Sequence, residues 1–178
     1  MRVAVYGGSF NPPHVAHQMA LAYVLATAHV DEVWMVPTFK HPFEKQLVPF
    51  SDRAKMCELA ASPFKAVRVS RVEEELGGES YTLRTMRALK ERHPDHRFSL
   101  VIGADLVAER ERWHGWAELK ELVPFIVVGR EGSPSTGGIA LPAVSSTIVR
   151  QRIGSGEPVD ALVAGDVLDY IRARGLYR

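Results

Sequence analysis

Residues 7–17 bring together residue types that suit the binding of a polyphosphate. They read Gly-Gly-Ser-Phe-Asn-Pro-Pro-His-Val-Ala-His. Because Gly7 and Gly8 have no side chains, backbone amides can approach phosphate oxygens there, and the amino terminus of a following helix favours negative charge. His14 and His17 add two hydrogen-bond donors. In phosphoryl-type transfer a protein mainly positions the reactants and offsets developing charge, so the segment predicts catalysis without a protein nucleophile.

A second group of polar residues near the carboxyl end has the spacing of a phosphate-binding helix start. Residues 144–150 read Val-Ser-Ser-Thr-Ile-Val-Arg, in which Ser145 or Ser146 can cap a helix. Thr147 and the first-turn amides can then meet phosphate, with Arg150 about one turn further on. Alone, this pattern is typical of an ordinary capped helix. Together with residues 7–17 it predicts a grip on the leaving pyrophosphate.

Short apolar runs that alternate with helical patterns must position these groups. Strands are expected where apolar, β-rich runs end at turn residues, at residues 2–6, 33–36, 67–70, 98–102 and 125–128. Helices are expected where apolar residues recur at helical spacing, at residues 15–29, 52–61 with an N-cap at Ser51, 81–92, 116–122, and from about 145 and about 159. The alternation predicts an α/β fold, a Rossmann-like, doubly wound parallel sheet of five to six strands with helices on both faces. Ligands are then expected at the carboxyl ends of the strands, and the turn at residues 7–8 follows such an end.

Length and turn residues indicate how the chain is organised. The 178 residues suit a single domain, residues 1–178, whose carboxyl-terminal part from about 145 to 178 is helical. Residues 38–50 and 129–138 are rich in turn formers and are expected as loops. The first of these loops contains Lys40, His41 and Lys45.

The composition excludes several classes of protein. With 22 Lys and Arg against 21 Asp and Glu, no strong overall field recruits nucleic acid or an anionic membrane. The one cysteine, Cys57, excludes an internal disulfide or a Cys-based zinc cluster. No apolar run approaches the roughly 20 residues of a membrane helix, and the amino terminus does not resemble a signal segment. We therefore expect a cytoplasmic protein with a local ligand site, and the oligomeric state stays open, a homo-oligomer included.

Both phosphate segments resemble motifs of one superfamily. Residues 7–17 are similar to the nucleotidylyltransferase signature, Gly-Gly-Ser/Thr-Phe-Asp-Pro followed by His-x-Gly-His, although Asn11 replaces the usual Asp and Ala16 the usual Gly. Residues 144–150 resemble the Ile-Ser-Ser-Thr-x-x-Arg motif, which binds the β and γ phosphates of ATP in that superfamily. The resemblance implies ATP contacts at Gly7, Gly8, Ser9, Phe10, His17, Gly103, Asp105, Arg130, Ser146, Thr147 and Arg150.

The middle of the chain resembles bacterial nicotinate-nucleotide adenylyltransferases. Residues 80–86, Ser-Tyr-Thr-Leu-Arg-Thr-Met, are similar to a Ser-Tyr-Thr-x-Asp-Thr-Leu segment in which threonines and nearby amides meet the pyridine carboxylate. Thr82 and Thr85 match it, and simple helix capping is the alternative use of either threonine. Arg84 replaces the usual acidic residue; it could hold an anionic substrate or face water.

Aromatic and basic residues extend this resemblance. Residues 102–105, Ile-Gly-Ala-Asp, followed by Trp113 and Trp116, are similar to the family's Gly-x-Asp and tryptophan region, where an aromatic ring stacks on the pyridine. Trp113 is the preferred stacking residue, and Trp116 fits ordinary packing better. Arg130 corresponds to the family's Val-x-Arg segment near the adenine. Residues 167–177 resemble the family's carboxyl terminus, which ends near a Leu-Tyr pair.

The basic loop matches less closely. The family's Pro-Pro-His-Lys loop appears at residues 39–45 as Phe-Lys-His-Pro-Phe-Glu-Lys, so either Lys40 or Lys45 could reach the triphosphate. We assign the role to Lys45, and Arg53 lies at the family's loop-following Arg position. The resemblance implies acceptor contacts at Ser9, Phe10, Lys45, Thr82, Thr85 and Trp113.

The activity implied by the resemblance is transfer of the adenylyl group of ATP to nicotinate mononucleotide, which forms deamido-NAD and pyrophosphate in NAD biosynthesis. The implied catalytic residues are His14, His17, Lys45 and Arg150. Mg²⁺ enters with ATP as co-substrate and is held mainly by phosphates and water, so no protein ligands are predicted. Nicotinamide mononucleotide and phosphopantetheine are rival acceptors. A non-catalytic nucleotide-binding sensor with the same fold is the alternative from another class.

Overall fold

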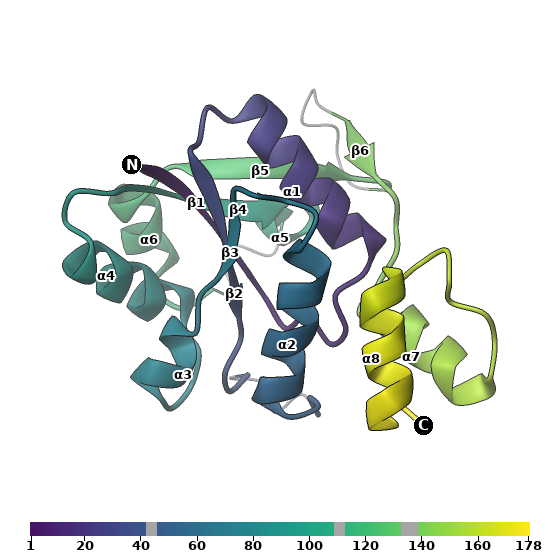
Figure 1. Cartoon of the computed structure of the whole chain (residues 1–178). Coiled ribbons are helices and arrows are strands. Elements are labelled where there is room, and N and C mark those ends of the chain that lie inside the picture. The colour runs from purple at the N-terminus through teal and green to yellow at the C-terminus, as the bar shows by residue number, and fades with distance from the viewer. Residues whose placement is uncertain (42–45, 109–112, 133–138) are drawn as a thin grey trace.

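A parallel sheet of six strands forms the centre of the fold (Figure 1). The computed structural model describes residues 1–41, 46–108, 113–132 and 139–178. The strands are β1 (Arg2–Gly8), β2 (Glu32–Pro37), β3 (Val67–Val69), β4 (Arg97–Gly103), β5 (Phe125–Arg130) and β6 (Ala140–Leu141). Their order is β3-β2-β1-β4-β5-β6, and each neighbouring pair is parallel. The doubly wound α/β prediction is confirmed, and the order reverses between β1 and β4.

Helices cover both faces of the sheet. They are α1 (Val15–Thr27), α2 (Phe50–Ala61), α3 (Val72–Leu76), α4 (Thr82–Arg92), α5 (Ala104–Ala108), α6 (Trp116–Leu122), α7 (Ser146–Ser155) and α8 (Gly165–Arg174). Buried side chains of α1 and α2 pack with one face, and those of α3, α4 and α6 pack with the other. In Figure 1, α7 and α8 stand together at one side of the sheet, next to α2.

Alternation along the central strands separates the two halves of the core. Val3 and Val5 of β1 belong to the cluster with α4 and α6, whereas Ala4 between them belongs to the cluster with α1. In β2, likewise, Val33 and Met35 face one side and Trp34 and Val36 the other. Because successive side chains point to opposite faces, a strand covered by helices on both sides is apolar throughout. This is why short apolar runs located these strands.

A third cluster joins the carboxyl-terminal helices to the sheet layers. Met56 and Ala60 of α2 pack with Val149 of α7 and with Val167 and Ile171 of α8. All five side chains are almost completely buried. Since burial of each large aliphatic side chain contributes roughly 1.5–3 kcal/mol, α7 and α8 are held firmly beside α2.

Several predicted boundaries were wrong, and the reasons are local. Helix α2 begins at Phe50 with Pro49, not Ser51, as its N-cap, because the carbonyl of Pro49 accepts the first helical hydrogen bonds. The final helix begins at Gly165 and not near Val159. Val159 lies in a turn whose carbonyl accepts from the amides of Leu162 and Val163. The apolar residues at 159 and 163, whose spacing suggested a helix, are buried in the third cluster.

Three short elements were not predicted, namely α3, α5 and β6. Helix α3 has three glutamates among five residues, so it carries no apolar periodicity to read. Strand β6 has two residues and extends the sheet beyond β5. Part of the loop expected at 129–138 lies outside the described residues, and its first two residues complete β5.

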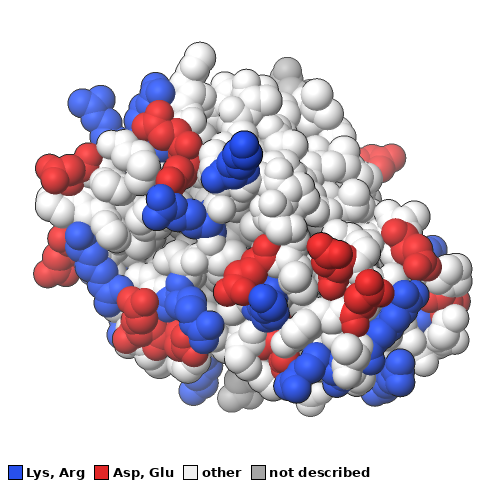
Figure 2. All heavy atoms as spheres, viewed as in Figure 1, with Lys and Arg blue, Asp and Glu red and all other residues white. Residues whose placement is uncertain are grey.

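The surface carries mixed charge. Figure 2 shows Lys and Arg interspersed with Asp and Glu over the visible face. Such mixing agrees with the near balance of 22 basic and 21 acidic residues. Among the described residues, no helix combines the length and the apolar character that crossing a membrane requires.

Candidate active site

The turn after β1 has a backbone that depends on glycine and on an inward-facing aromatic ring. A Cβ at Gly8 would lie 3.0 Å from the ring of Phe10, so no larger residue fits there without moving that ring. Phe10 has φ of 45° and is 1% exposed. Its ring packs edge-on against Tyr6 and His17, with centroids 5.6 and 5.0 Å away. The buried ring of Phe10 therefore packs against the turn and against Tyr6 and His17.

The two predicted histidines are in contact at the start of α1. Their ring centroids are 3.8 Å apart, and His14 is 6% exposed. The backbone N–H of His14 donates to Nδ1 of His17 at 3.1 Å. A neutral imidazole that accepts at Nδ1 carries its hydrogen at Nε2, so this contact makes Nε2 of His17 a donor. A donor at the start of a helix is suited to a phosphate oxygen.

The second phosphate segment forms the start of α7 and lies directly against the first. Ser145 is the N-cap and accepts from the amide of Ile148 at 3.3 Å. The hydroxyl of Ser146 donates to the carbonyl of Pro12 at 2.9 Å. Arg150 donates from Nη1 to the carbonyl of Asn11 at 2.8 Å. Segments more than 130 positions apart in the chain are thus joined by two hydrogen bonds.

Thr147, at the start of α7, and Gly103, at the end of β4, are two further predicted ATP contacts. Thr147 is exposed, and its hydroxyl oxygen accepts from Nη2 of Arg150 at 3.4 Å. Gly103 ends β4, which pairs with β1. A Cβ at Gly103 would collide with the carboxylate of Asp105, which folds back over it. The position of the Asp105 side chain therefore requires glycine at residue 103, next to the point where the strand order reverses.

Arg53 serves the loop after β2 from inside the protein. It is 1% exposed. Its guanidinium donates at 2.6–3.3 Å to four backbone carbonyl oxygens. One lies in the turn after β1, and the other three lie in the loop after β2: Ser9, then Thr38, Phe39 and Val48. This arginine holds backbone in place and does not present its charge to solvent. Lys45 lies outside the described residues, whereas Lys40 is exposed and forms a β-bridge with Glu79.

A buried carboxylate underlies the segment predicted to meet the acceptor. Glu73 is 9% exposed and accepts from the hydroxyl of Thr85 at 3.0 Å and from the amide of Phe39 at 3.0 Å. Burial raises the pKa of Glu73, and these hydrogen bonds act in the opposite direction. Thr85 is 4% exposed, so its hydroxyl is committed to Glu73. Thr82 begins α4 and is partly exposed.

Arg84 is exposed, and its guanidinium is hydrogen-bonded to the backbone of a neighbouring helix end. Its guanidinium donates to the carbonyls of Gly77 at 2.6 Å and Leu76 at 2.7 Å. These are carbonyls at the end of α3, where no further helical donors follow. Gly77 and Gly78 have φ of 62° and 69°, which lets the chain turn back toward α4. Arg84 thus caps α3 from the first turn of α4.

The predicted stacking residue lies near the start of α4. Trp113 is half-buried and packs against the core cluster that contains Leu83. Its ring is nearly perpendicular to that of Trp116, at 5.9 Å. The rings of Tyr81 and His114 are 4.8 Å apart beside it. Arg130 ends β5, and its side chain lies outside the described residues.

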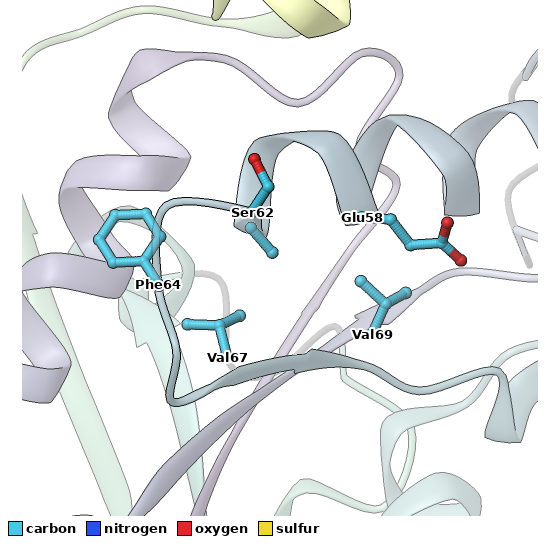
Figure 3. Close-up of a pocket in the computed structure, with 6 residues that line it drawn as sticks. Glu58, Ser62, Phe64, Val67 and Val69 are labelled. Atoms are coloured by element: carbon cyan, nitrogen blue, oxygen red, sulfur yellow. The ribbon is translucent and has the colours of Figure 1, made fainter.

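A surface recess of about 290 Å³ lies elsewhere, between α2 and β3 (Figure 3). Figure 3 shows Glu58 of α2 and Ser62, which directly follows α2, above Val67 and Val69 of β3, with Phe64 at one end. No predicted phosphate or acceptor residue lines this recess. It is separate from the residues that the two phosphate segments bring together.

Comparison with known proteins decides the family. Residues 5–152 match the cytidylyltransferase-like family. The chain is 50% identical over 180 residues to a probable nicotinate-nucleotide adenylyltransferase of Anaeromyxobacter sp. (strain K), covering 99% of this chain and 96% of that one. It is 43% identical to a protein of the same name from Myxococcus xanthus, covering 99% and 95%. The chain belongs to the nicotinate-nucleotide adenylyltransferase family.

A solved structure agrees with the nicotinate-nucleotide adenylyltransferase assignment at the level of fold. The chain is similar to the Plasmodium falciparum nicotinic acid mononucleotide adenylyltransferase complexed with NaAD, with a TM-score of 0.85 and 21% identity. The match covers 99% of this chain and 97% of that one. The relatives at 43–50% identity confirm the family that the resemblance of the middle of the chain implies, within the superfamily implied by the two phosphate segments.

Three residues that support the candidate site are not indicated by the sequence pattern. Glu73 lies in a run of three glutamates that gives no hint which one is buried. In the sequence, Asn11 stands out only because it replaces the usual Asp. Tyr177 stands out only as part of the Leu-Tyr pair that resembles the family's carboxyl terminus. A spacing pattern does not reveal them, because their partners come from distant parts of the chain.

Proposed function

We propose that this protein transfers the adenylyl group of ATP to nicotinate mononucleotide and forms deamido-NAD and pyrophosphate, a step of NAD biosynthesis. The observation that carries the proposal is the joining of the two phosphate segments through Ser146 to Pro12 and Arg150 to Asn11. It is supported by relatives of 35–50% identity over nearly the whole chain whose names state this activity.

ATP would lie with its triphosphate between the turn after β1 and the start of α7. Gly7, Gly8 and Ser9 supply backbone amides there, and Nε2 of His17 supplies a donor. A guanidinium carries five N–H donors, and Arg150 spends donors on Asn11 and Thr147. The remaining donors can meet the β and γ phosphates together with the backbone amide of Ser146 and the hydroxyl of Thr147.

The chemistry is an in-line displacement at phosphorus. A phosphate oxygen of the mononucleotide forms a bond to the α-phosphorus, and the bond from that phosphorus to the oxygen bridging to the β-phosphate breaks. The electron pair leaves with pyrophosphate. His14, His17, Lys45 and Arg150 are proposed to offset this negative charge, which is the main contribution a protein makes to such transfers.

Magnesium fits this site as a partner of the phosphates. Among the described residues no group of three or more His, Cys, Asp or Glu side chains could hold a metal ion. Mg²⁺ commonly keeps several waters and binds through substrate phosphates, so the chain needs no cage for it. When bound, the ion would neutralise part of the triphosphate charge, and the donors named above would orient the same phosphates.

The acceptor would be held at the amino end of α4. Thr82 and the first-turn amides of this 11-residue helix can meet the pyridine carboxylate, and Trp113 lies nearby for stacking. Thr85 contributes by fixing α4 to Glu73. The remaining proposed contacts of the two nucleotides are Ser9, Phe10, Lys45, Gly103, Asp105 and Arg130.

Pyrophosphate release from magnesium ATP tests the proposal. Nicotinate mononucleotide, nicotinamide mononucleotide and phosphopantetheine are compared as acceptors, and we expect turnover with the first. His17→Ala should lower kcat by at least about 100-fold, as loss of a donor to developing charge does elsewhere. His96→Ala is the matched control. His96 directly precedes the amino end of β4, whereas the candidate site lies at the carboxyl end of that strand.

Each other outcome of the assay has its own meaning. Preference for another acceptor would keep the chemistry and reject nicotinate mononucleotide. ATP binding without pyrophosphate release for any acceptor would reject the enzyme and favour a nucleotide-binding sensor.

A further inference from the structure

The side chain of Asn11 is a buried junction between three parts of the chain. It is 2% exposed. Its Oδ1 accepts from the amide of Val48 at 3.3 Å and from the hydroxyl of Tyr177 at 2.9 Å. Its Nδ2 donates to the carbonyl of Gln46 at 3.4 Å. The amide orientation follows from these partners, because a backbone N–H must meet the oxygen and a backbone carbonyl must meet the nitrogen.

The backbone next to this side chain holds the phosphate segment of α7. The carbonyl of Asn11 accepts from Arg150, and the carbonyl of Pro12 accepts from Ser146. A displacement of Asn11 would therefore move the partner that orients Arg150. It would also release residues 46–48, which directly follow Lys45 in the chain.

Tyr177 reaches this junction from the far end of the chain. Its ring packs on the third core cluster, beyond the end of α8. Its φ is 67°, a conformation that L-residues adopt only when their surroundings enforce it. The bond of its hydroxyl to Asn11, at 2.9 Å, is the shortest of the three that hold the Asn11 side chain. The other two, at 3.3 and 3.4 Å, are longer than the roughly 2.7–3.2 Å usual for an N–H···O hydrogen bond, so the tyrosine bond contributes most to fixing the amide.

We propose that Tyr177 is a positioning residue for ATP, which acts through Asn11 to hold residues 46–48 and Arg150 in the arrangement that receives the triphosphate. The inference rests on the proposed function, because it takes ATP as the ligand of these groups. It gives Tyr177 a role in the site through a partner, Asn11, that lies 166 positions away in the sequence.

Asn11 suits this junction better than the Asp that the resemblance leads one to expect. An ionised carboxylate only accepts hydrogen bonds, so Asp at this position could not donate to the carbonyl of Gln46. It would set a carboxylate oxygen against that carbonyl inside the protein. Asn11→Asp should therefore loosen residues 46–48 even though it restores a familiar motif.

The decisive variant is Tyr177→Phe, which removes the hydroxyl and keeps the ring in the cluster. The loss of one hydrogen bond corresponds to a change of about 2- to 10-fold in a binding constant. We expect the KM for ATP to rise by that factor and the KM for the acceptor to stay unchanged. Tyr170→Phe is the matched control. It removes a hydroxyl from the same end of the chain, one that donates to Asp52 at 2.7 Å. It should leave both KM values as they are.

A double-mutant cycle separates action through Asn11 from general loosening of the tail. If Tyr177 acts through Asn11, adding Tyr177→Phe to Asn11→Ala should raise the KM for ATP no further. Independent, additive effects would overturn the proposal. So would a Tyr177→Phe enzyme with the wild-type KM for ATP, or an equal rise in Tyr170→Phe.

Hydrogen exchange gives a readout that needs no catalysis. Without ligand, the amide of Val48 should exchange faster in Tyr177→Phe and in Asn11→Asp than in the wild type, and Tyr170→Phe should not change it. Unchanged exchange in Tyr177→Phe would overturn the proposal. An inactive wild type with the expected exchange pattern would instead reject the proposed function and leave the Asn11 junction in place.

Discussion

At the residue scale, the charge reversal at Arg84 has a local structural use. An acidic residue is usual at this position in the family it resembles, and an arginine there suggested either substrate binding or exposure. The exposed guanidinium donates to the carbonyls of Leu76 and Gly77 and so links the end of α3 to α4. Because α4 begins two residues before Arg84, this contact also bears on the proposed acceptor site.

Substitution at Arg84 distinguishes its geometry from its charge. Arg84→Lys keeps the charge and loses the fork, whereas Arg84→Met loses both. We expect both variants to raise the KM for nicotinate mononucleotide by a similar factor of about 2 to 5, since both lose charge-assisted bonds at an exposed site. Steady-state kinetics with both mononucleotides measures this. A Lys variant that behaves as wild type while the Met variant loses its preference for nicotinate would show that the charge acts on substrate.

At the element scale, Glu73 joins three pieces of secondary structure. It belongs to α3, accepts from Phe39 in the loop after β2, and accepts from Thr85 on α4. A buried carboxylate with several donors stabilises a junction but is costly to ionise. Burial is the larger effect here, and it raises the pKa of Glu73 above the ordinary 4.5.

The pH dependence of stability should show this cost. A raised pKa in the folded state means that the contribution of Glu73 is fully present below pH 4.5, its ordinary value, and is lost as the pH rises through the raised pKa. Glu73→Gln does not ionise, and the hydroxyl of Thr85 can turn to Tyr81, whose carbonyl is 3.3 Å away. The unfolding free energy of the wild type should therefore fall relative to that of Glu73→Gln over this window. Urea unfolding at a series of pH values checks it, and a difference that grows in favour of the wild type as pH rises would contradict the assignment.

At the scale of the whole molecule, the carboxyl-terminal helices pack against the sheet layers and contribute to the candidate site. Helix α7 carries Ser146 and Arg150 to the turn after β1, and α8 packs on α2 through Val167 and Ile171. The site is thus assembled from both ends of the chain. A single folding unit, as its length suggests, would make α7 and α8 unfold together with the sheet.

A substitution that creates a cavity beside α8 tests whether the chain unfolds as one unit. Val167 is fully buried in the third cluster, and Val167→Ala should lower the unfolding free energy by about 2 kcal/mol. All three tryptophans, Trp34, Trp113 and Trp116, lie before residue 145 and so report on the rest of the molecule. In one cooperative unit, the tryptophan fluorescence transition in urea shifts by the full amount. A fluorescence transition that stays at the wild-type midpoint would show that residues 145–178 fold separately.

The sequence by itself determined the order and type of the main elements and both phosphate segments. The reason is that strands buried on both faces are apolar throughout, helices repeat at 3.6 residues, and turns need glycine or proline, all of which are local patterns. Only the tertiary structure decided that Arg53 serves buried carbonyls, that Arg84 caps α3, and that Tyr177 meets Asn11. Arg53 and Tyr177 bind partners that lie up to 44 and 166 positions away. Arg84 meets carbonyls seven and eight positions before it, across the turn between two helices. The spacing of residues along a chain does not show which groups of other elements folding brings within hydrogen-bond reach.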